Sequence, residues 1–132
     1  MIGIVGCGKA KLTRPARAKD LYTGTLFCAQ YRYAKARCHT VFILSAKYGL
    51  VRDTEMLRPY DVTVSNFSAE QKNEWCKLVA GQLQTVGAGK ILALVSAPYE
   101  QALEPRAADV VNPLRGLPLG KRCQFLTRSS VQ

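Results

Sequence analysis

The residues best suited to chemistry lie between positions 44 and 61, where a hydrophobic stretch runs into a polar one. Lys47 follows a stretch that predicts a buried strand, so its amine is expected to be partly desolvated and able to stabilise negative charge or act as a nucleophile. Asp61 supplies a carboxylate, while Tyr48 and Tyr60 supply rings that could hold a planar base. We therefore expect a ligand site in this segment.

A second interpretation of the same segment needs no ligand. Arg52, Asp53, Glu55 and Arg58 suit a solvated helical turn, and Tyr60 then fills the core. Both interpretations fit the sequence.

Asp20 is the other carboxylate that could do chemistry. It is the only acidic residue among the first 52, and cations surround it. We expect it to be ionised and able to orient a water or stabilise an oxocarbenium-like sugar. The following Tyr22, Thr23 and Gly24 would shape a pocket beside a helix start. In a second interpretation, Asp20 pairs with a neighbouring cation and Thr23 only caps the helix.

Two shorter segments also follow expected strands. In the first, Gly8 lets the backbone approach a ligand, Lys9 adds a charge for phosphate, and Cys7 is a candidate nucleophile. The glycines match neither the dinucleotide nor the P-loop fingerprint, so a plain turn with a buried structural thiol is the alternative. In the second segment, Ser96 and Tyr99 begin a helix, where Ser96 is either a ligand contact or an N-cap.

Hydrophobic periodicity indicates the elements that must position these segments. The pattern predicts strands over about 2–6, 40–44, 90–95 and 109–111, and helices over about 25–37, 69–85, 99–107 and 119–128. Ser68 and Gln71 have the spacing of a capping box at the start of the second helix.

This alternation predicts one α/β domain over residues 1–132. Short connections, and a late strand that is apolar on both faces, favour three layers, with a mostly parallel central sheet flanked by helices. The strands of such a sheet end at one edge, where ligands bind. Lys9, Asp20, Lys47 and Asp61 are therefore expected to line one cleft.

Positive charge gathers at the two ends of the chain. Residues 1–40 hold eight Lys or Arg against one acid, and residues 106–132 hold five against one, in a chain whose net charge is +10. If the ends adjoin, they form one face able to gather phosphates. The alternative is a solvated basic surface. The candidate basic face consists of Lys9, Lys11, Arg14, Arg17 and Lys19 with Arg115, Lys121, Arg122 and Arg128.

The cysteines and the amino-terminal stretch bear on the class of protein. Five scattered cysteines without a CxxC pair argue against a disulfide framework and a zinc site, which favours a reduced, cytoplasmic protein. Met1–Val5 is apolar but too short for a signal peptide or a membrane span, so we expect no membrane partner.

Four segments, taken in order, carry a resemblance to known families. They are Gly8-Lys9-Ala10-Lys11, Asp20-Leu21-Tyr22-Thr23-Gly24, Leu44 to Asp61, and Ser96 to Tyr99. The chain resembles short bacterial and phage proteins of uncharacterised function with CGKxK, DLYTG and ILSAKYGL...PYD motifs. It is more distantly similar to the YaaA family of peroxide stress proteins, with agreement over most of residues 5–104.

The similarity to the YaaA family implies DNA binding through a positive cleft and an enzymatic role for the central site. This chain is shorter, and is expected to lack the helical additions that carry DNA-binding hairpins in that family while keeping the central pocket. Its central motif is also similar to domains attached to tRNA deazaguanine-modifying enzymes, an analogy that keeps the ligand within nucleobase or nucleic-acid chemistry.

The sequence therefore predicts a protein that binds a nucleotide or nucleic acid and hydrolyses an N-glycosidic bond without a metal or cofactor. The alternatives are a non-catalytic DNA- or RNA-binding module related to the YaaA family, and a cofactor-dependent transferase acting on a small phosphorylated metabolite. The sequence leaves the oligomeric state open. The candidate catalytic residues are Asp20, Lys47 and Asp61, and the candidate substrate-binding residues are Cys7, Gly8, Lys9, Tyr22, Thr23, Gly24, Ser45, Tyr48, Gly49, Tyr60, Ser96 and Tyr99.

Overall fold

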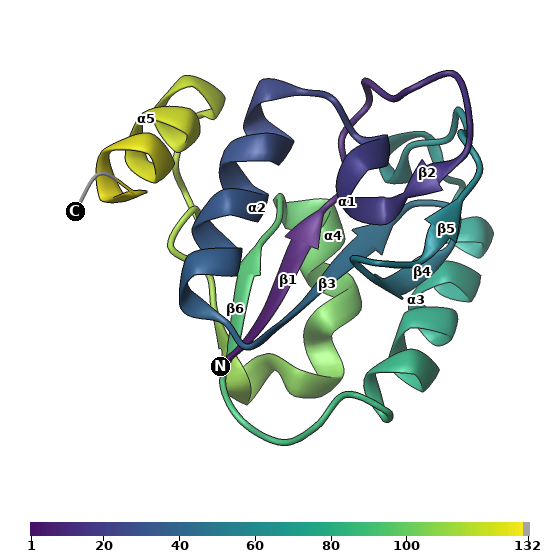
Figure 1. Cartoon of the computed structure of the whole chain (residues 1–132). Coiled ribbons are helices and arrows are strands. Elements are labelled where there is room, and N and C mark those ends of the chain that lie inside the picture. The colour runs from purple at the N-terminus through teal and green to yellow at the C-terminus, as the bar shows by residue number, and fades with distance from the viewer. Residues whose placement is uncertain (131–132) are drawn as a thin grey trace.

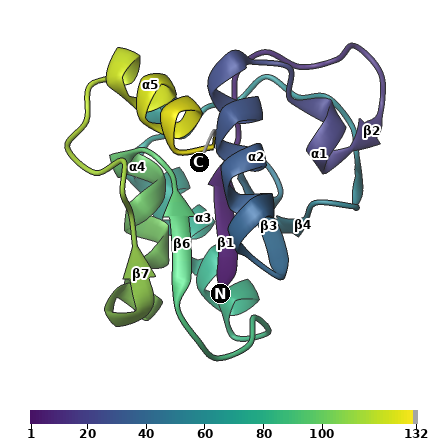
Figure 2. The same ribbon diagram turned by 60° about the vertical axis from the view of Figure 1, so that its left-hand side comes forward.

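A five-stranded sheet organises the molecule. The computed structural model describes residues 1–130, with side chains for residues 1–128. β1, β3, β6 and β7 pair in parallel, and β4 is antiparallel to β3. The predicted α/β fold with a mostly parallel central sheet is confirmed. The strands lie in the order β4-β3-β1-β6-β7 (Figure 1, with β7 labelled in Figure 2). Their bounds are β1 Ile2–Gly6, β3 Thr40–Ser45, β4 Gly49–Arg52, β6 Ile91–Leu94 and β7 Val110–Val111.

Most helices begin and end close to where the hydrophobic periodicity predicts. The helix expected over 25–37 has those bounds, and the one expected over 69–85 ends at Leu83. Ser68 caps the latter: its Oγ accepts the Gln71 amide and the Gln71 side chain accepts the Ser68 amide, so the predicted capping box is confirmed. The helices are α1 Ala18–Leu21, α2 Thr25–Arg37, α3 Ala69–Leu83, α4 Ala97–Glu100 and α5 Leu119–Ser130, with 3₁₀ segments η1 Val64–Asn66 and η2 Gln101–Asp109.

The helix predicted over 99–107 differs from the structure. A single α-turn, α4, passes into the 3₁₀ segment η2, whose backbone leaves helical angles at Arg106. Pro105 precedes this kink and has no backbone N–H to continue a helical ladder. The chain then enters the short strand β7 at Val110.

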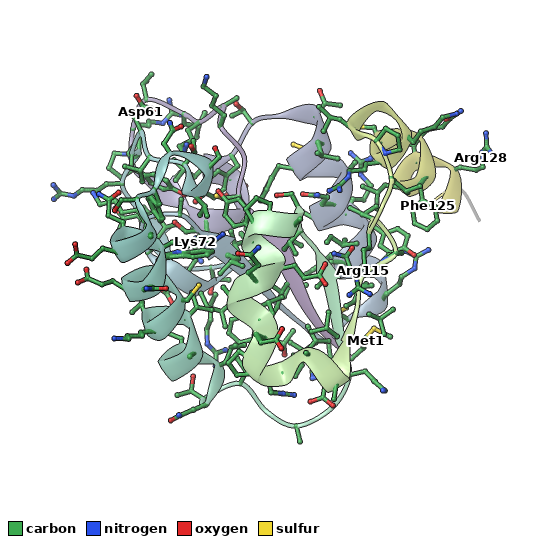
Figure 3. The ribbon with its side chains drawn as sticks, turned by 180° about the vertical axis from the view of Figure 1, so that it is seen from behind. Met1, Asp61, Lys72, Arg115, Phe125 and Arg128 are labelled. Atoms are coloured by element: carbon green, nitrogen blue, oxygen red, sulfur yellow. The ribbon has the colours of Figure 1, made fainter. Side chains whose placement is uncertain are left out.

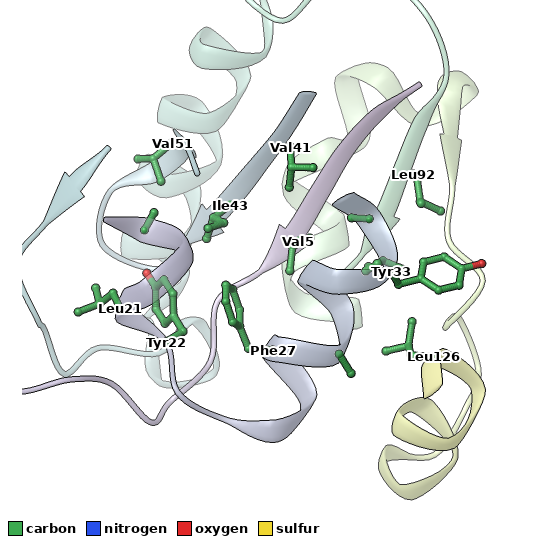
Figure 4. Packing of buried hydrophobic residues seen from close by; sticks show 14 of the residues in the cluster. Val5, Leu21, Tyr22, Phe27, Tyr33, Val41, Ile43, Val51, Leu92 and Leu126 are labelled. Atoms are coloured by element: carbon green, nitrogen blue, oxygen red, sulfur yellow. The ribbon is translucent and has the colours of Figure 1, made fainter. Parts of the chain in front are cut away.

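Successive side chains of the central strands enter two different hydrophobic clusters, as the alternation of a strand requires. Val5 and Ile43 belong to the cluster that includes residues of α2 and α5 (Figure 4). Ile4 and Leu44 belong to the cluster that includes Trp75 of α3 and residues of η2. Helices therefore contribute to both clusters, and β1 is buried along its whole length.

The segment after β3 forms a hairpin that the sequence did not reveal. β4 turns back along β3, with Ser45 opposite Gly49. Gly49 has a φ of +72°, and a side chain there would also collide with Gln82 of α3. The Ser45 hydroxyl accepts the backbone amides of Lys47 and Tyr48 at 3.1 and 3.0 Å, which fixes the turn.

The proposed helical turn at Arg52–Arg58 is wrong. β4 ends at Arg52, and a second strand, β5 Met56–Leu57, pairs with β2 Ala16–Arg17 in a small antiparallel sheet. Asp53 is buried, and its carboxylate accepts a hydrogen bond from the Tyr31 hydroxyl at 2.7 Å. This carboxylate therefore ties the segment after β4 to α2.

The carboxy-terminal helix α5 packs against α2 (Figure 2). Leu126 is fully buried, and the rings of Phe125 and Tyr33 lie 6.0 Å apart. The contact brings the basic carboxy-terminal part of the chain beside the helix that follows β1.

Candidate functional site

The order of the strands creates a crevice at the carboxyl ends of β1 and β6. The chain leaves β1 through α2 to reach β3 on one side, and leaves β6 through α4 and η2 to reach β7 on the other side. Because the two connections depart in opposite directions, their loops separate above β1 and β6. This reversal of strand order is where open α/β sheets bind ligands.

A cavity of about 660 Å³ occupies that position. Its walls come from the segment after β1, the first turns of α2, the end of β6 with the start of α4, and the beginning of α5. We call this cavity the switch-point pocket. It is lined by Gly6, Cys7, Gly8, Lys9, Ala10, Gly24, Thr25, Leu26, Phe27, Gln30, Val95, Ser96, Tyr99, Leu117, Leu119 and Arg122.

The charges around the pocket have one sign. Lys9 and Arg122 are its charged residues, and no acidic side chain is among those that line it in the described part of the chain. The amino terminus of α2 adds to this field, because Gly24 at the N-cap provides no side chain to bond the first amides of the helix. The pocket is therefore suited to an anionic group such as phosphate.

Lys9 and Arg122 also bear on the predicted basic face. They come from the two basic ends of the chain and line the same cavity, so the ends adjoin there. Arg115, another member of that face, instead donates hydrogen bonds to both carboxylate oxygens of Glu100.

Tyr99 and Cys7 meet at the pocket wall. The Tyr99 hydroxyl and the Cys7 Sγ are 3.4 Å apart, and the Trp75 ring packs edge-on to Tyr99. Burial raises the pKa of Tyr99 far above its ordinary value, and the nearby Cys7 adds to the effect. Tyr99 is therefore a neutral hydroxyl at the pocket wall at neutral pH.

Three predicted tyrosines form a cluster outside the walls of this pocket. The hydroxyls of Tyr22 and Tyr60 are 2.6 Å apart, and the Ser45 hydroxyl donates to that of Tyr60 at 2.8 Å. The Tyr48 ring packs edge-on to Tyr60, and the Lys11 amine lies 4.4 Å from the centre of the Tyr60 ring. Through Ser45, these contacts join the tyrosines to the carboxyl end of β3.

Burial is the main cause of the altered acidity in this cluster. Tyr22 is 2 % exposed, and burial raises its pKa to about 12. Burial likewise raises the pKa of Tyr60, with Cys7 the next contributor. Both hydroxyls are therefore protonated at neutral pH and act as hydrogen-bonding groups of the core.

The predicted catalytic residues are separated in space, so the expectation that they line one cleft with Lys9 is wrong. Asp20 lines a second cavity of about 640 Å³ on the other flank of α2. Lys47 is exposed rather than desolvated, because it lies in the turn between β3 and β4. Asp61 is exposed, and Figure 3 places it at the opposite end of the molecule from Arg128 of α5.

Residues 2–128 match the family of unknown function DUF6884. The chain belongs to this family. No curated protein matches the sequence significantly.

Six of the predicted binding residues of this DUF6884 protein meet in the switch-point pocket, because all six follow β1 or β6 or precede α2. They are Cys7, Gly8, Lys9, Gly24, Ser96 and Tyr99. Thr23 is exposed beside them and its amide bonds to the Ala10 carbonyl. Ser45 and Gly49 belong to the β3–β4 turn.

Sequence reasoning missed the half of the pocket that comes from α2 and α5. Leu26, Phe27 and Gln30 lie on one helical face, a spacing of three and four residues that the sequence does display. Leu117 and Leu119 have no local signal, because only the docking of α5 on α2 brings them over the sheet.

No group of three or more His, Cys, Asp or Glu side chains within residues 1–128 could hold a metal ion. In the described part of the chain, no helix has the length and apolar character needed to cross a membrane.

Proposed function

We propose that this DUF6884 protein binds a nucleotide, free or within nucleic acid, in the switch-point pocket. The observation that carries the proposal is a pocket at the strand-order reversal whose only charged lining residues within the described chain are Lys9 and Arg122. Phosphate would be held at these cations and at the first amides of α2. The apolar walls suit the faces of a base.

The electrostatic support for a phosphate comes from three separate elements. α2 is 13 residues long and its amino terminus opens into the pocket, so its macrodipole favours a negative group there. Lys9 is exposed on the loop after β1, and Arg122 is half-buried on α5. Arg122 Nε donates to the Leu117 carbonyl at 2.9 Å, which anchors part of its guanidinium at the pocket rim.

Binding measurements test this proposal directly. Titration with nucleoside mono- and diphosphates and with short oligonucleotides should give saturable binding that Lys9→Ala and Arg122→Ala each weaken by about tenfold, as expected for one charge-assisted contact. Lys77→Ala is the matched control, because Lys77 is exposed on α3 and lines neither cavity. Equal affinities for all four proteins would contradict the proposal.

The second cavity favours nucleic acid over a free nucleotide as the ligand of this protein. This cavity shares Phe27 with the switch-point pocket and is lined by Lys19, Arg32 and Lys35 beside Asp20. These cations could contact the phosphate next to a nucleotide seated in the pocket. If they do, Arg32→Ala should reduce the salt dependence of oligonucleotide binding and leave mononucleotide binding unchanged.

Hydrolysis of an N-glycosidic bond is a further proposal for this pocket. The positions of the carboxylates support it less than they support binding without hydrolysis. No acidic residue lines the pocket in the described chain, and Asp20 opens to the neighbouring cavity. If Asp20 is catalytic, Asp20→Asn should lower base release by a factor of about 10² to 10⁴ while affinity is kept. Release of base by both proteins at one rate would remove Asp20 from the mechanism.

Three finer expectations belong to the same proposal. We infer three layers, because helices join both hydrophobic clusters of the sheet. A cytoplasmic location is supported by the five free cysteines. Kinship with the YaaA family is supported by the gathering of Gly8, Lys9, Ser96 and Tyr99 in one pocket, and a superposition on a member of that family would test it.

A further inference from the structure

Gln30 is a buried polar residue whose side-chain amide has no hydrogen-bond partner among the described residues. It lies in α2 and is 5 % exposed, among a few buried polar side chains in a largely apolar interior. The other buried polar side chains, Ser45, Asp53 and Asn112, all make hydrogen bonds. Within the described chain, the Gln30 side-chain amide makes none. An amide in such a position is costly unless something else bonds it.

The amide of Gln30 faces the switch-point pocket. Every fully enclosed side-chain nitrogen or oxygen of the described residues has a hydrogen-bond partner. The unpartnered atoms of Gln30 must therefore keep contact with open space, and the cavity that Gln30 lines is the switch-point pocket. A group inside that pocket is thus placed to bond the amide.

The position of Gln30 along α2 sets it away from the phosphate end of the pocket. It lies five residues after Thr25, which is about 7.5 Å along a helix axis. Lys9 and the first amides of α2 lie at the carboxyl edge of the sheet, whereas Gln30 lies deeper between the helix and the strands. A ligand with its anionic end at that edge would present its other end to Gln30.

The chemistry of a primary amide limits what this other end can be. Gln30 offers both a donor and an acceptor, and the edges of nucleobases present paired donors and acceptors in a plane. Leu26 and Phe27 beside it supply apolar surface that suits the face of a ring. A hydrocarbon at this position would leave the amide unbonded.

We propose that Gln30 recognises the base edge of the nucleotide held in the switch-point pocket. The proposal rests on the proposed function and makes Gln30 the residue that determines base specificity. Because Gln30 is buried, a base that cannot pair with its side-chain amide leaves a buried polar group unsatisfied, and such sites discriminate strongly.

The test separates recognition of the base from recognition of the phosphate. Wild-type protein is titrated with the four nucleoside 5′-monophosphates, the four corresponding single-stranded homopolymers, and ribose 5-phosphate, which has no base. At least one base should bind about tenfold or more tightly than the others or than ribose 5-phosphate, the range of one paired contact. Gln30→Leu should abolish this preference, whereas Lys9→Ala should weaken every ligand alike.

Gln30→Glu provides the matched variant, because it keeps the shape and replaces the donor with an acceptor. It should change the order of preference among the bases rather than erase it. Thermal unfolding of each variant checks that the fold is kept, and Gln30→Met replaces Gln30→Leu if that variant does not fold. An unchanged order of preference in all Gln30 variants would overturn the inference while leaving the proposed function intact. Absence of binding by nucleotides, homopolymers and ribose 5-phosphate would overturn both.

Discussion

Ser45 illustrates how one buried hydroxyl organises the carboxyl edge of the sheet. Its Oγ accepts two backbone amides of the β3–β4 turn and donates to Tyr60, while its carbonyl accepts the indole N–H of Trp75 at 3.0 Å. Two backbone amides of the turn are thereby bonded inside the protein. Ser45 therefore stabilises the backbone of the β3–β4 turn and is not among the residues that line the switch-point pocket.

The tyrosine cluster predicts how stability should respond to alkali. The pKa of Tyr22 is raised by burial from 10.0 to about 12, so the folded form keeps its proton where the unfolded form has lost it. The stabilisation is complete below pH 10 and should be lost as the pH rises toward 12. Urea unfolding at several pH values, with tyrosinate absorbance as a second readout, measures this loss.

Tyr22→Phe provides the comparison for that experiment. Without the hydroxyl, the variant should show a shallower fall in the free energy of unfolding over the same pH interval. A fall as steep as in the wild-type protein would mean that Tyr22 titrates freely and does not contribute.

At the scale of elements, the segment between β7 and α5 carries one wall of the pocket. Asn112 donates to the Val95 carbonyl at 3.1 Å and to Glu100 at 2.7 Å, and its Oδ1 accepts the Leu114 amide. Arg115 donates to the same Glu100, and this lowers the pKa of the Glu100 carboxyl. These bonds fix the segment to the end of β6 and to α4. The same segment leads to Leu117 and Arg122, so their positions depend on how it is held.

Removing the Asn112 amide should loosen this wall. Asn112→Ala leaves buried partners unbonded, so the free energy of unfolding should fall by about 1–3 kcal/mol. The affinity for nucleotide should fall as well, because Leu117 and Arg122 lose their support. Urea unfolding and nucleotide titration measure the two effects, and Asn73→Ala on the exposed face of α3 is the control. An intact affinity in Asn112→Ala would show that the wall is held by other contacts.

At the scale of the whole molecule, the docking of α5 on α2 completes the pocket. Residues near the start of the chain, its middle and its end contribute to one cavity, as Lys9, Ser96 and Arg122 illustrate. The cavity therefore depends on the packing of α5 as much as on the sheet.

Leu126 is the residue through which this dependence can be measured. It is fully buried in the cluster that includes residues of α2, so Leu126→Ala should cost about 2–5 kcal/mol of stability. Nucleotide affinity should also fall, since α5 carries Leu119 and Arg122. Leu78→Ala is the control, because Leu78 is 44 % exposed on α3 and should change neither quantity appreciably. Equal losses in both variants would contradict a specific role for α5.

The sequence by itself determined the elements whose signals are local. The helix over 25–37, the capping box of Ser68 and Gln71, and the strands β1, β3 and β6 follow from periodicity and side-chain chemistry within a few residues. The choice of an α/β fold with a mostly parallel sheet follows from their alternation. Cys7, Lys9 and Ser96 were found because residues that follow parallel strands meet at one edge.

Only the tertiary structure decided which side chains share the pocket. Asp20 and Lys9 are close together in the sequence, yet α2 lies between the two cavities that they line. Gln30 and Arg122 enter the pocket because two helices pack side by side over the sheet, a contact between residues far apart in the chain. The hairpin of β3 and β4 likewise depends on Gln82 of α3, which bonds the backbone on both sides of Gly49. Such contacts leave no periodic pattern in the sequence, because they depend on which faces of separate elements meet.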